Sequence, residues 1–173
     1  MVKISIDLWG VIFSFPKDSS HSEIYAQTTF EPNSIESIRT LVETIGATNC
    51  HIISLVKSQK ESKTRKKLMD LNFCEQTGFL SENILFVHSD AVGNNKGLAI
   101  QELGITDHID DSLKILNTIP DNVRKYWYKP DTCNQELELE RAENKCEDET
   151  KFPHFDSWIV LKKLIIDNVN EQD

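Results

Sequence analysis

Carboxylate, hydroxyl and ammonium side chains lie at the ends of apolar runs in this sequence, where they could do chemistry together. Asp7 closes the first apolar run, Ser54 closes the next, and Asp110 and Asp111 end a later one. Lys96 begins the helix-like stretch that precedes this later run. Because open parallel sheets bind ligands outside the carboxyl ends of their strands, we expect these groups to converge on one edge of a sheet.

The excess of acid in this set predicts a divalent cation. Three neighbouring carboxylates repel one another and disfavour their own ionisation. Hard oxygen ligands suit Mg²⁺, which usually keeps waters and phosphate oxygens as further ligands. Each group also has a simpler explanation: a strand-end Asp often caps a turn, and Asp110 and Asp111 could cap the next helix. Taken together, the groups favour a site.

The elements that would position these groups follow from apolar runs that alternate with helix-like stretches. We expect strands at 2–7, 50–54, 83–88, 106–110 and 123–128, and helices at 35–45, 62–73, 96–103, 112–118 and 157–169. This alternation implies right-handed crossovers and a mostly parallel sheet covered on both faces. The predicted fold is an α/β, three-layer, Rossmann-like domain.

Length and composition predict one domain that spans residues 1–173. The chain is long enough for one full core, and its 39% hydrophobic and 27% charged residues are ordinary for a soluble protein. No apolar run approaches a membrane span, and the N-terminal residues lack the pattern of a secretory signal. We therefore expect no membrane association and a cytoplasmic location.

Two segments fall outside the alternation of strands and helices. Residues 14–31 are expected to form a loop or small flap. Residues 131–151 are expected to be an acidic peripheral segment, because 136–149 holds seven acids against two bases. The net charge of −9 argues against general nucleic-acid binding.

The ordered motifs "ISIDLWGVI", "HIISL", Lys96 and "HIDDS" resemble the four motifs of the haloacid dehalogenase superfamily of phosphohydrolases. The stretch from His51 to Pro130 further resembles small, uncharacterised bacterial members of that superfamily. Those members carry a turn of the form F-x-x-T-G and a strand of the form G-I-T-H-F-x-D-D, which appear here as the six residues Phe73–Gly78 and as "GITDHIDDSLKIL". The resemblance covers roughly residues 2–130 and the final helix, and four motifs in order are more specific than any one of them.

The resemblance implies covalent catalysis of phosphoryl transfer. Asp7 would be the nucleophile that attacks phosphorus and forms an aspartyl-phosphate. Ser54 would hydrogen-bond the transferred phosphoryl group. Lys96 would neutralise that group and hold Asp7 in place. Ser54 and Lys96 would thus bind the phosphorylated substrate as well as assist its reaction.

The same resemblance implies a Mg²⁺ site. Asp7 would be one ligand, the backbone carbonyl of Trp9 a second, and Asp111 a third, directly or through water. Asp110 would support this set.

Trp9 departs from the pattern of the superfamily's phosphatases, which usually place a second aspartate two residues after the nucleophile. That aspartate protonates the leaving group and later activates water, and tryptophan has no titratable group for either step. Three interpretations remain open: a slow or differently assisted phosphatase, a phosphotransferase, or a catalytically silent phosphate-binding scaffold. The dehalogenase branch carries an aromatic residue here, but its arginine and cap domain have no counterpart in this sequence.

Short insertion points suggest a site without a cap domain or with a minimal one. Such an open site suits phosphorylated substrates that include macromolecules. The alternative, from a different functional class, is a non-enzymatic binding module with the same fold, which the loss of the acid at Trp9 would favour.

Overall fold

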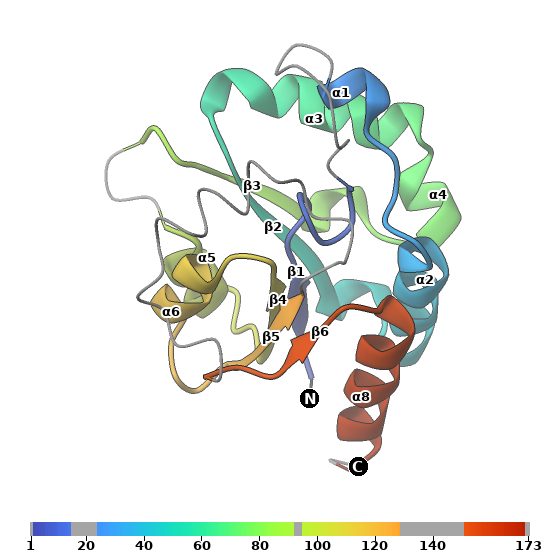
Figure 1. The fold of residues 1–173 in the computed structure, drawn as a ribbon, viewed down its shortest axis with the longest axis vertical. Helices are drawn as coiled ribbons and strands as arrows, with labels where there is room; N and C mark the ends of the chain where they lie inside the picture. The colour runs from blue at the N-terminus through green and yellow to red at the C-terminus, as the bar shows by residue number, and fades with distance from the viewer. Residues whose placement is uncertain (1, 15–23, 92–94, 129–150, 172–173) are drawn as a thin grey trace.

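A six-stranded parallel sheet organises the chain (Figure 1). The computed structural model describes residues 2–14, 24–91, 95–128 and 151–171. The strand order is β3-β2-β1-β4-β5-β6, and every pairing is parallel. The strands are β1 (Ile4–Ile6), β2 (Cys50–Val56), β3 (Ile84–His88), β4 (Asp107–Asp110), β5 (Arg124–Tyr128) and β6 (His154–Phe155). The first strand is therefore central, between β2 and β4.

Helices cover both faces of this sheet, as expected for a three-layer Rossmann-like arrangement (Figure 1). One face packs against α2 (Ser34–Ile45), α3 (Ser58–Asp70), α4 (Phe73–Thr77) and α8 (Trp158–Asn170). The other face packs against α5 (Lys96–Glu102) and α6 (Leu113–Thr118). The short helix α1 (Ile24–Gln27) and the 3₁₀ turns Ala47–Asn49 and Ser81–Asn83 complete the described elements.

Side-chain alternation along the central strands divides the core in two. Ile6 and Ile52 belong to the apolar cluster beneath α2 and α8. Ile53 belongs to the smaller cluster with Ile100 of α5. Since successive residues of a strand point to opposite faces, this division identifies the face to which each neighbouring side chain belongs.

The α/β class, the five expected strands and the helix-covered parallel sheet are confirmed, whereas several boundaries differ. The predicted helix 62–73 corresponds to α3, but its bounds are wrong: α3 spans Ser58–Asp70, and the left-handed backbone of Asn72 (φ 50°) separates it from α4. Strands β2 and β6 also differ, because β2 continues to Val56 and the two-residue β6 was not predicted.

The two unusual segments are described in part only. Helix α1 lies within the described part of 14–31, and Phe30 of this segment forms an isolated antiparallel bridge with Phe13. Residues 15–23 lie outside the described residues. The expected acidic peripheral segment, 131–151, lies outside them apart from Lys151.

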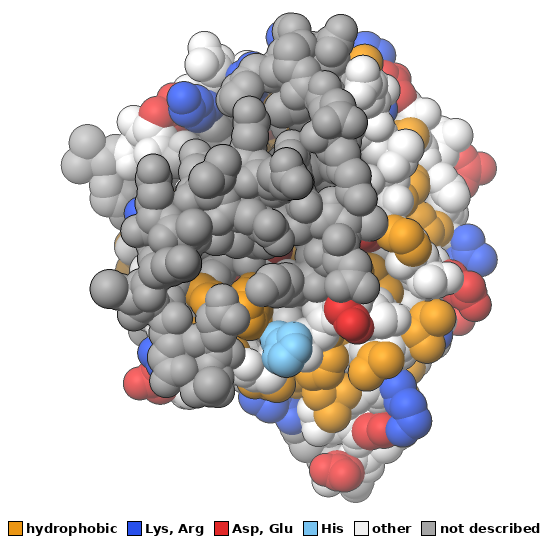
Figure 2. Space-filling view, in the orientation of Figure 1, with side chains coloured by type: hydrophobic (Ala, Val, Ile, Leu, Met, Phe, Trp, Pro, Cys, Tyr) orange, Lys and Arg blue, Asp and Glu red, His pale blue; other side chains and the backbone are white. Residues whose placement is uncertain are grey.

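The outer surface of α8 mixes apolar and charged side chains (Figure 2). Ile159 and Val160 are more than half exposed on this helix, while Trp158 and Leu161 are fully buried. None of the described helices is both long enough and apolar enough to cross a bilayer.

Helix α8 is joined to the turn after β1 by a buried hydrogen bond. The Trp158 indole N–H donates to the Val11 carbonyl at 2.7 Å, and both residues have no exposed surface. The last helix therefore supports the segment that directly follows Asp7.

Trp158→Phe should lower the free energy of unfolding by about 2–4 kcal/mol, because the buried Val11 carbonyl loses its donor and the smaller ring packs less well. Urea denaturation measures this loss. The control Val160→Ala, on the exposed side of the same helix, should change stability by less than about 0.5 kcal/mol. Equal losses in the two variants would contradict a specific role for the indole hydrogen bond.

Candidate metal and phosphoryl site

Two central strands bring Asp7 and Asp110 together. Strands β1 and β4 pair in parallel with Ile6 opposite Ile109, and the Asp7 amide donates to the Ile109 carbonyl at 2.9 Å. Asp7 follows β1 directly and Asp110 is the last residue of β4. Because Ile6 and Ile109 belong to the same core cluster, their neighbours Asp7 and Asp110 lie on the opposite face.

The first turn of α5 carries Lys96 into this pair. The Asn95 side chain accepts a hydrogen bond from the Leu98 amide at 2.8 Å, which caps the helix and starts it at Lys96. A Cβ at Gly97 would lie 2.7 Å from the Thr118 carbonyl oxygen, so glycine allows α5 to approach the end of α6 closely. The sequence around Lys96 thus determines where its side chain enters the sheet edge.

The Lys96 ammonium bridges the two aspartates. Its Nζ lies 2.6 Å from Asp7 Oδ1 and 2.5 Å from Asp110 Oδ2. All three residues are buried, with Lys96 only 2% exposed. Buried charges of this kind persist only when they are paired and hydrogen-bonded, as these are.

Asp110 has further donors on both of its oxygens. The Ser112 amide donates to Oδ1 at 2.9 Å, and His108 Nε2 lies 3.1 Å from Oδ2. His108 Nδ1 in turn lies 2.7 Å from Ser5 Oγ. Ser5, His108 and Asp110 thereby form one buried chain that ends at Lys96.

Burial and neighbouring charges act differently on the two aspartates. Burial raises the pKa of Asp7, aided by the charge of Asp110, and the opposing attraction of Lys96 does not cancel this rise. Burial also acts to raise the pKa of Asp110, but Lys96 and His108 outweigh it and lower that pKa to about 2. Of these two carboxylates, Asp7 is therefore the one whose charge is less fully compensated.

The pKa values of Lys96 and His108 are shifted by the same environment. Burial alone would lower the pKa of Lys96, but Asp110 and Asp7 raise it well above its usual value. Burial lowers the pKa of His108 despite its contact with Asp110, which favours a neutral imidazole.

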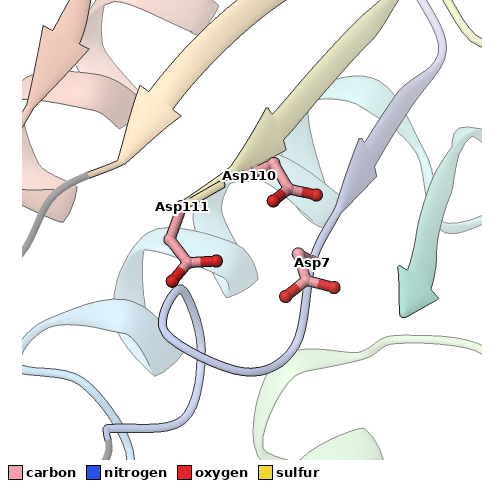
Figure 3. A group of neighbouring side chains, drawn as sticks. All are labelled: Asp7, Asp110 and Asp111. Carbon is pink, nitrogen blue, oxygen red and sulfur yellow. The ribbon is translucent and has the colours of Figure 1, made fainter. Parts of the chain in front are cut away.

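Asp111 completes an acidic cluster with Asp7 and Asp110 (Figure 3). One oxygen from each carboxylate lies within 4.8 Å of the others. The Trp127 indole N–H donates to the Asp111 carbonyl at 3.0 Å and holds this residue beyond the end of β4. Oxygen ligands at this spacing fit a hard divalent cation such as Mg²⁺.

The turn after β1 passes directly beneath the Asp111 carboxylate (Figure 3). Gly10 lies there with a φ of +78°, and a Cβ at this position would overlap the Asp111 side chain. Glycine is therefore needed both for the left-handed backbone and for the space.

Trp9 follows Asp7 by two residues and belongs to an aromatic group. Its half-buried ring packs edge-on against Phe13 and Tyr25, with centroids 5.3 Å away in each case. The assignment of its backbone carbonyl to the metal stays a prediction.

Ser54 is placed differently from what the sequence suggested. It lies inside β2, two residues before the end of that strand, and shares a face with Ile52 and Val56 rather than with Asp7. Its buried hydroxyl has no hydrogen-bond partner among the described residues. Its role as a phosphoryl ligand stays a prediction, whereas its expected position at the end of the strand is corrected.

Sequence reasoning missed Ser5 and His108. The signal was present, because the period of two along each strand puts Ser5 on the face of Asp7 and His108 on the face of Asp110. The parallel register then brings Ser5 opposite His108.

Comparison of the chain with models of known protein families gives no match, and no curated protein matches its sequence.

Gly10→Ala should lower the free energy of unfolding by about 1–3 kcal/mol more than Gly104→Ala does, because the added methyl group must displace the Asp111 carboxylate. Gly104 is a matched control, since it also has a positive φ (+64°) but has no atom within 4 Å of an added Cβ. Urea denaturation of both variants gives the difference. The same loss in each would mean that Asp111 does not lie against this turn.

Proposed function

We propose that this protein is a Mg²⁺-dependent phosphohydrolase or phosphotransferase of the haloacid dehalogenase type that acts through an aspartyl-phosphate. The observation that carries the proposal is the buried Lys96 ammonium between Asp7 and Asp110, with Asp111 beside them. This arrangement unites three of the four resembling motifs at one sheet edge. Helices α3 and α4 fill most of the chain between β2 and β3, which supports a site with little or no cap.

Asp7 is the nucleophile in this proposal. Lys96 holds Oδ1 at 2.6 Å and so orients the carboxylate for attack on phosphorus. A phosphorus–oxygen bond to Asp7 forms as the bond from phosphorus to the leaving oxygen breaks. Lys96 also supplies a positive charge next to the charge that develops on the phosphoryl group.

Mg²⁺, when bound by Asp7 and Asp111, would offset the repulsion between these carboxylates and a phosphate. The raised pKa of Asp7 supports this need for a cation, because burial and Asp110 leave that carboxylate under-compensated.

Release of the phosphoryl group would be the slow stage. The leaving oxygen takes its proton from water, since Trp9 can donate none. A second water, or an acceptor hydroxyl, then attacks phosphorus and gives up its proton to solvent, and the bond to Asp7 breaks to restore the carboxylate. Loss of a positioned acid–base group reduces such rates by about 10²–10⁴-fold. The substrate would be a phosphomonoester, and an open site would accept one borne on a macromolecule.

A phosphate-binding module is the second candidate function, and the side chain of Trp9 favours it. The aromatic packing of Trp9 with Phe13 and Tyr25 occupies the position at which the superfamily's phosphatases keep an acid. A module of this kind would keep the metal site and lack turnover.

Mg²⁺ should raise the melting temperature of the wild-type protein, and Asp111→Asn should abolish that rise. Binding only to the native state stabilises it by about 2.7 kcal/mol at a concentration 100 times the dissociation constant. Asp121→Asn is the control, because it makes the same change at a fully exposed carboxylate and should leave the rise intact. Thermal unfolding with and without Mg²⁺ makes the measurement, and a rise that survives Asp111→Asn would exclude this site.

Trp9→Asp should increase hydrolysis of a generic aryl phosphomonoester by up to about 10²–10⁴-fold, because it restores a titratable group two residues after Asp7. Trp9→Phe, which keeps an aromatic ring, should give no increase, and Asp7→Asn should abolish turnover in either background. Steady-state hydrolysis rates of these variants in the presence of Mg²⁺ measure the effect. A Trp9→Asp protein that binds Mg²⁺ but stays inert would favour the binding module.

A further inference from the structure

His108 is a buried polar side chain that the mechanism above does not use. It has no exposed surface, and its ring spans the gap between Ser5 on β1 and Asp110 at the end of β4. Building on the proposed function, we propose that His108 is a positioning residue. It donates a hydrogen bond from Nε2 to Asp110 and so keeps Asp110 paired with Lys96 instead of ligating the cation.

The hydrogen bonds around Asp110 support this role. A carboxylate has about four acceptor positions, two on each oxygen. Oδ2 receives Lys96 Nζ and lies beside His108 Nε2, and Oδ1 receives the Ser112 amide. Three positions are then filled, which leaves Asp110 at most one for a metal ion. Direct ligation therefore falls chiefly to Asp7 and Asp111.

The chemistry of the two neighbours determines which nitrogen of His108 carries the proton. The ionised carboxylate of Asp110 can only accept, so Nε2 must donate to it. Nδ1 of the neutral ring is then an acceptor, and the Ser5 hydroxyl 2.7 Å away donates to it. The opposite tautomer would place the Nε2 lone pair against the Asp110 carboxylate at 3.1 Å.

In this proposal Asp110 and Asp111, which are adjacent in sequence, have different roles in the site. While His108 donates to Oδ2, Asp110 stays turned toward Lys96, and Lys96 stays within hydrogen-bond distance of Asp7. Without that donor, Asp110 regains an acceptor position and can turn toward the cation. Lys96 would then hold Asp7 less well, which would affect the reaction more than the binding of substrate.

His108→Gln and His108→Asn form a matched pair that tests this role. The glutamine amide can reach the position of Nε2, whereas the shorter asparagine amide reaches only that of Nδ1. His108→Gln should keep kcat and the Mg²⁺ concentration at half-maximal thermal stabilisation close to wild type. His108→Asn should lower kcat about tenfold, with little change in KM, because a hydrogen bond to a charged group is lost. It should also shift the Mg²⁺ midpoint to a lower concentration, since Asp110 gains an acceptor position.

Nitrogen NMR of the wild-type imidazole gives a readout that needs neither turnover nor a variant. A proton on Nε2 of His108 is expected, and a ring that carries its proton on Nδ1 alone would overturn the proposal even if both variants failed to fold. Equal effects of glutamine and asparagine on kcat and on the Mg²⁺ midpoint would overturn it too. If the wild-type protein and Trp9→Asp both show no hydrolysis, the proposed function fails, while the tautomer and the Mg²⁺ midpoints still decide the role of His108.

Discussion

The buried Lys96 ammonium allows two carboxylates to lie side by side at the centre of the sheet. Asp7 and Asp110 come from adjacent strands, and parallel pairing brings them together whether or not their charges are compensated. Lys96 contacts both, so a single cation from α5 links the two middle strands to a helix that packs on one face. Removing one partner from such a buried group typically costs about 3–5 kcal/mol, because the remaining charge is left unpaired. Fold and candidate chemistry therefore depend on the same contact.

The positive charge of Lys96 compensates the nearby carboxylates only in part. Three carboxylates share the neighbourhood of one ammonium group, and Asp7 is the acid whose pKa is raised. Asp110, in contrast, keeps its charge easily because Lys96, His108 and the Ser112 amide surround it. The asymmetry distinguishes the adjacent acids: Asp110 anchors the lysine, and in the proposed function Asp7 binds the cation and the substrate.

Much of this arrangement could be predicted from the sequence, because apolar runs place the strands and parallel strands end on one edge. The approach of Asp7, Asp110 and Asp111 follows from that rule, and Lys96 joins them from the start of α5. The end of β2 could not be predicted in the same way, because the apolar run through Leu55 and Val56 does not itself show where the strand stops. The pairing of these two residues with Val87 and His88 shows that the strand includes them. The start of α3 was missed because its first turns are polar and bury little before Thr64. His108 was missed because its partner, Ser5, is distant in sequence and becomes visible only through strand register.

The hydrogen bond between Trp158 and Val11 joins residues 147 positions apart and affects the order in which parts of the molecule can fold. Contacts of such long sequence separation close late, because the entropy of the intervening chain opposes them. During synthesis, β1 and the turn that carries Gly10 emerge from the ribosome well before the indole that secures this turn. A nascent chain that lacks α8 would thus present Asp7 on an unsupported turn, so the acidic edge is complete only after α8 has been made.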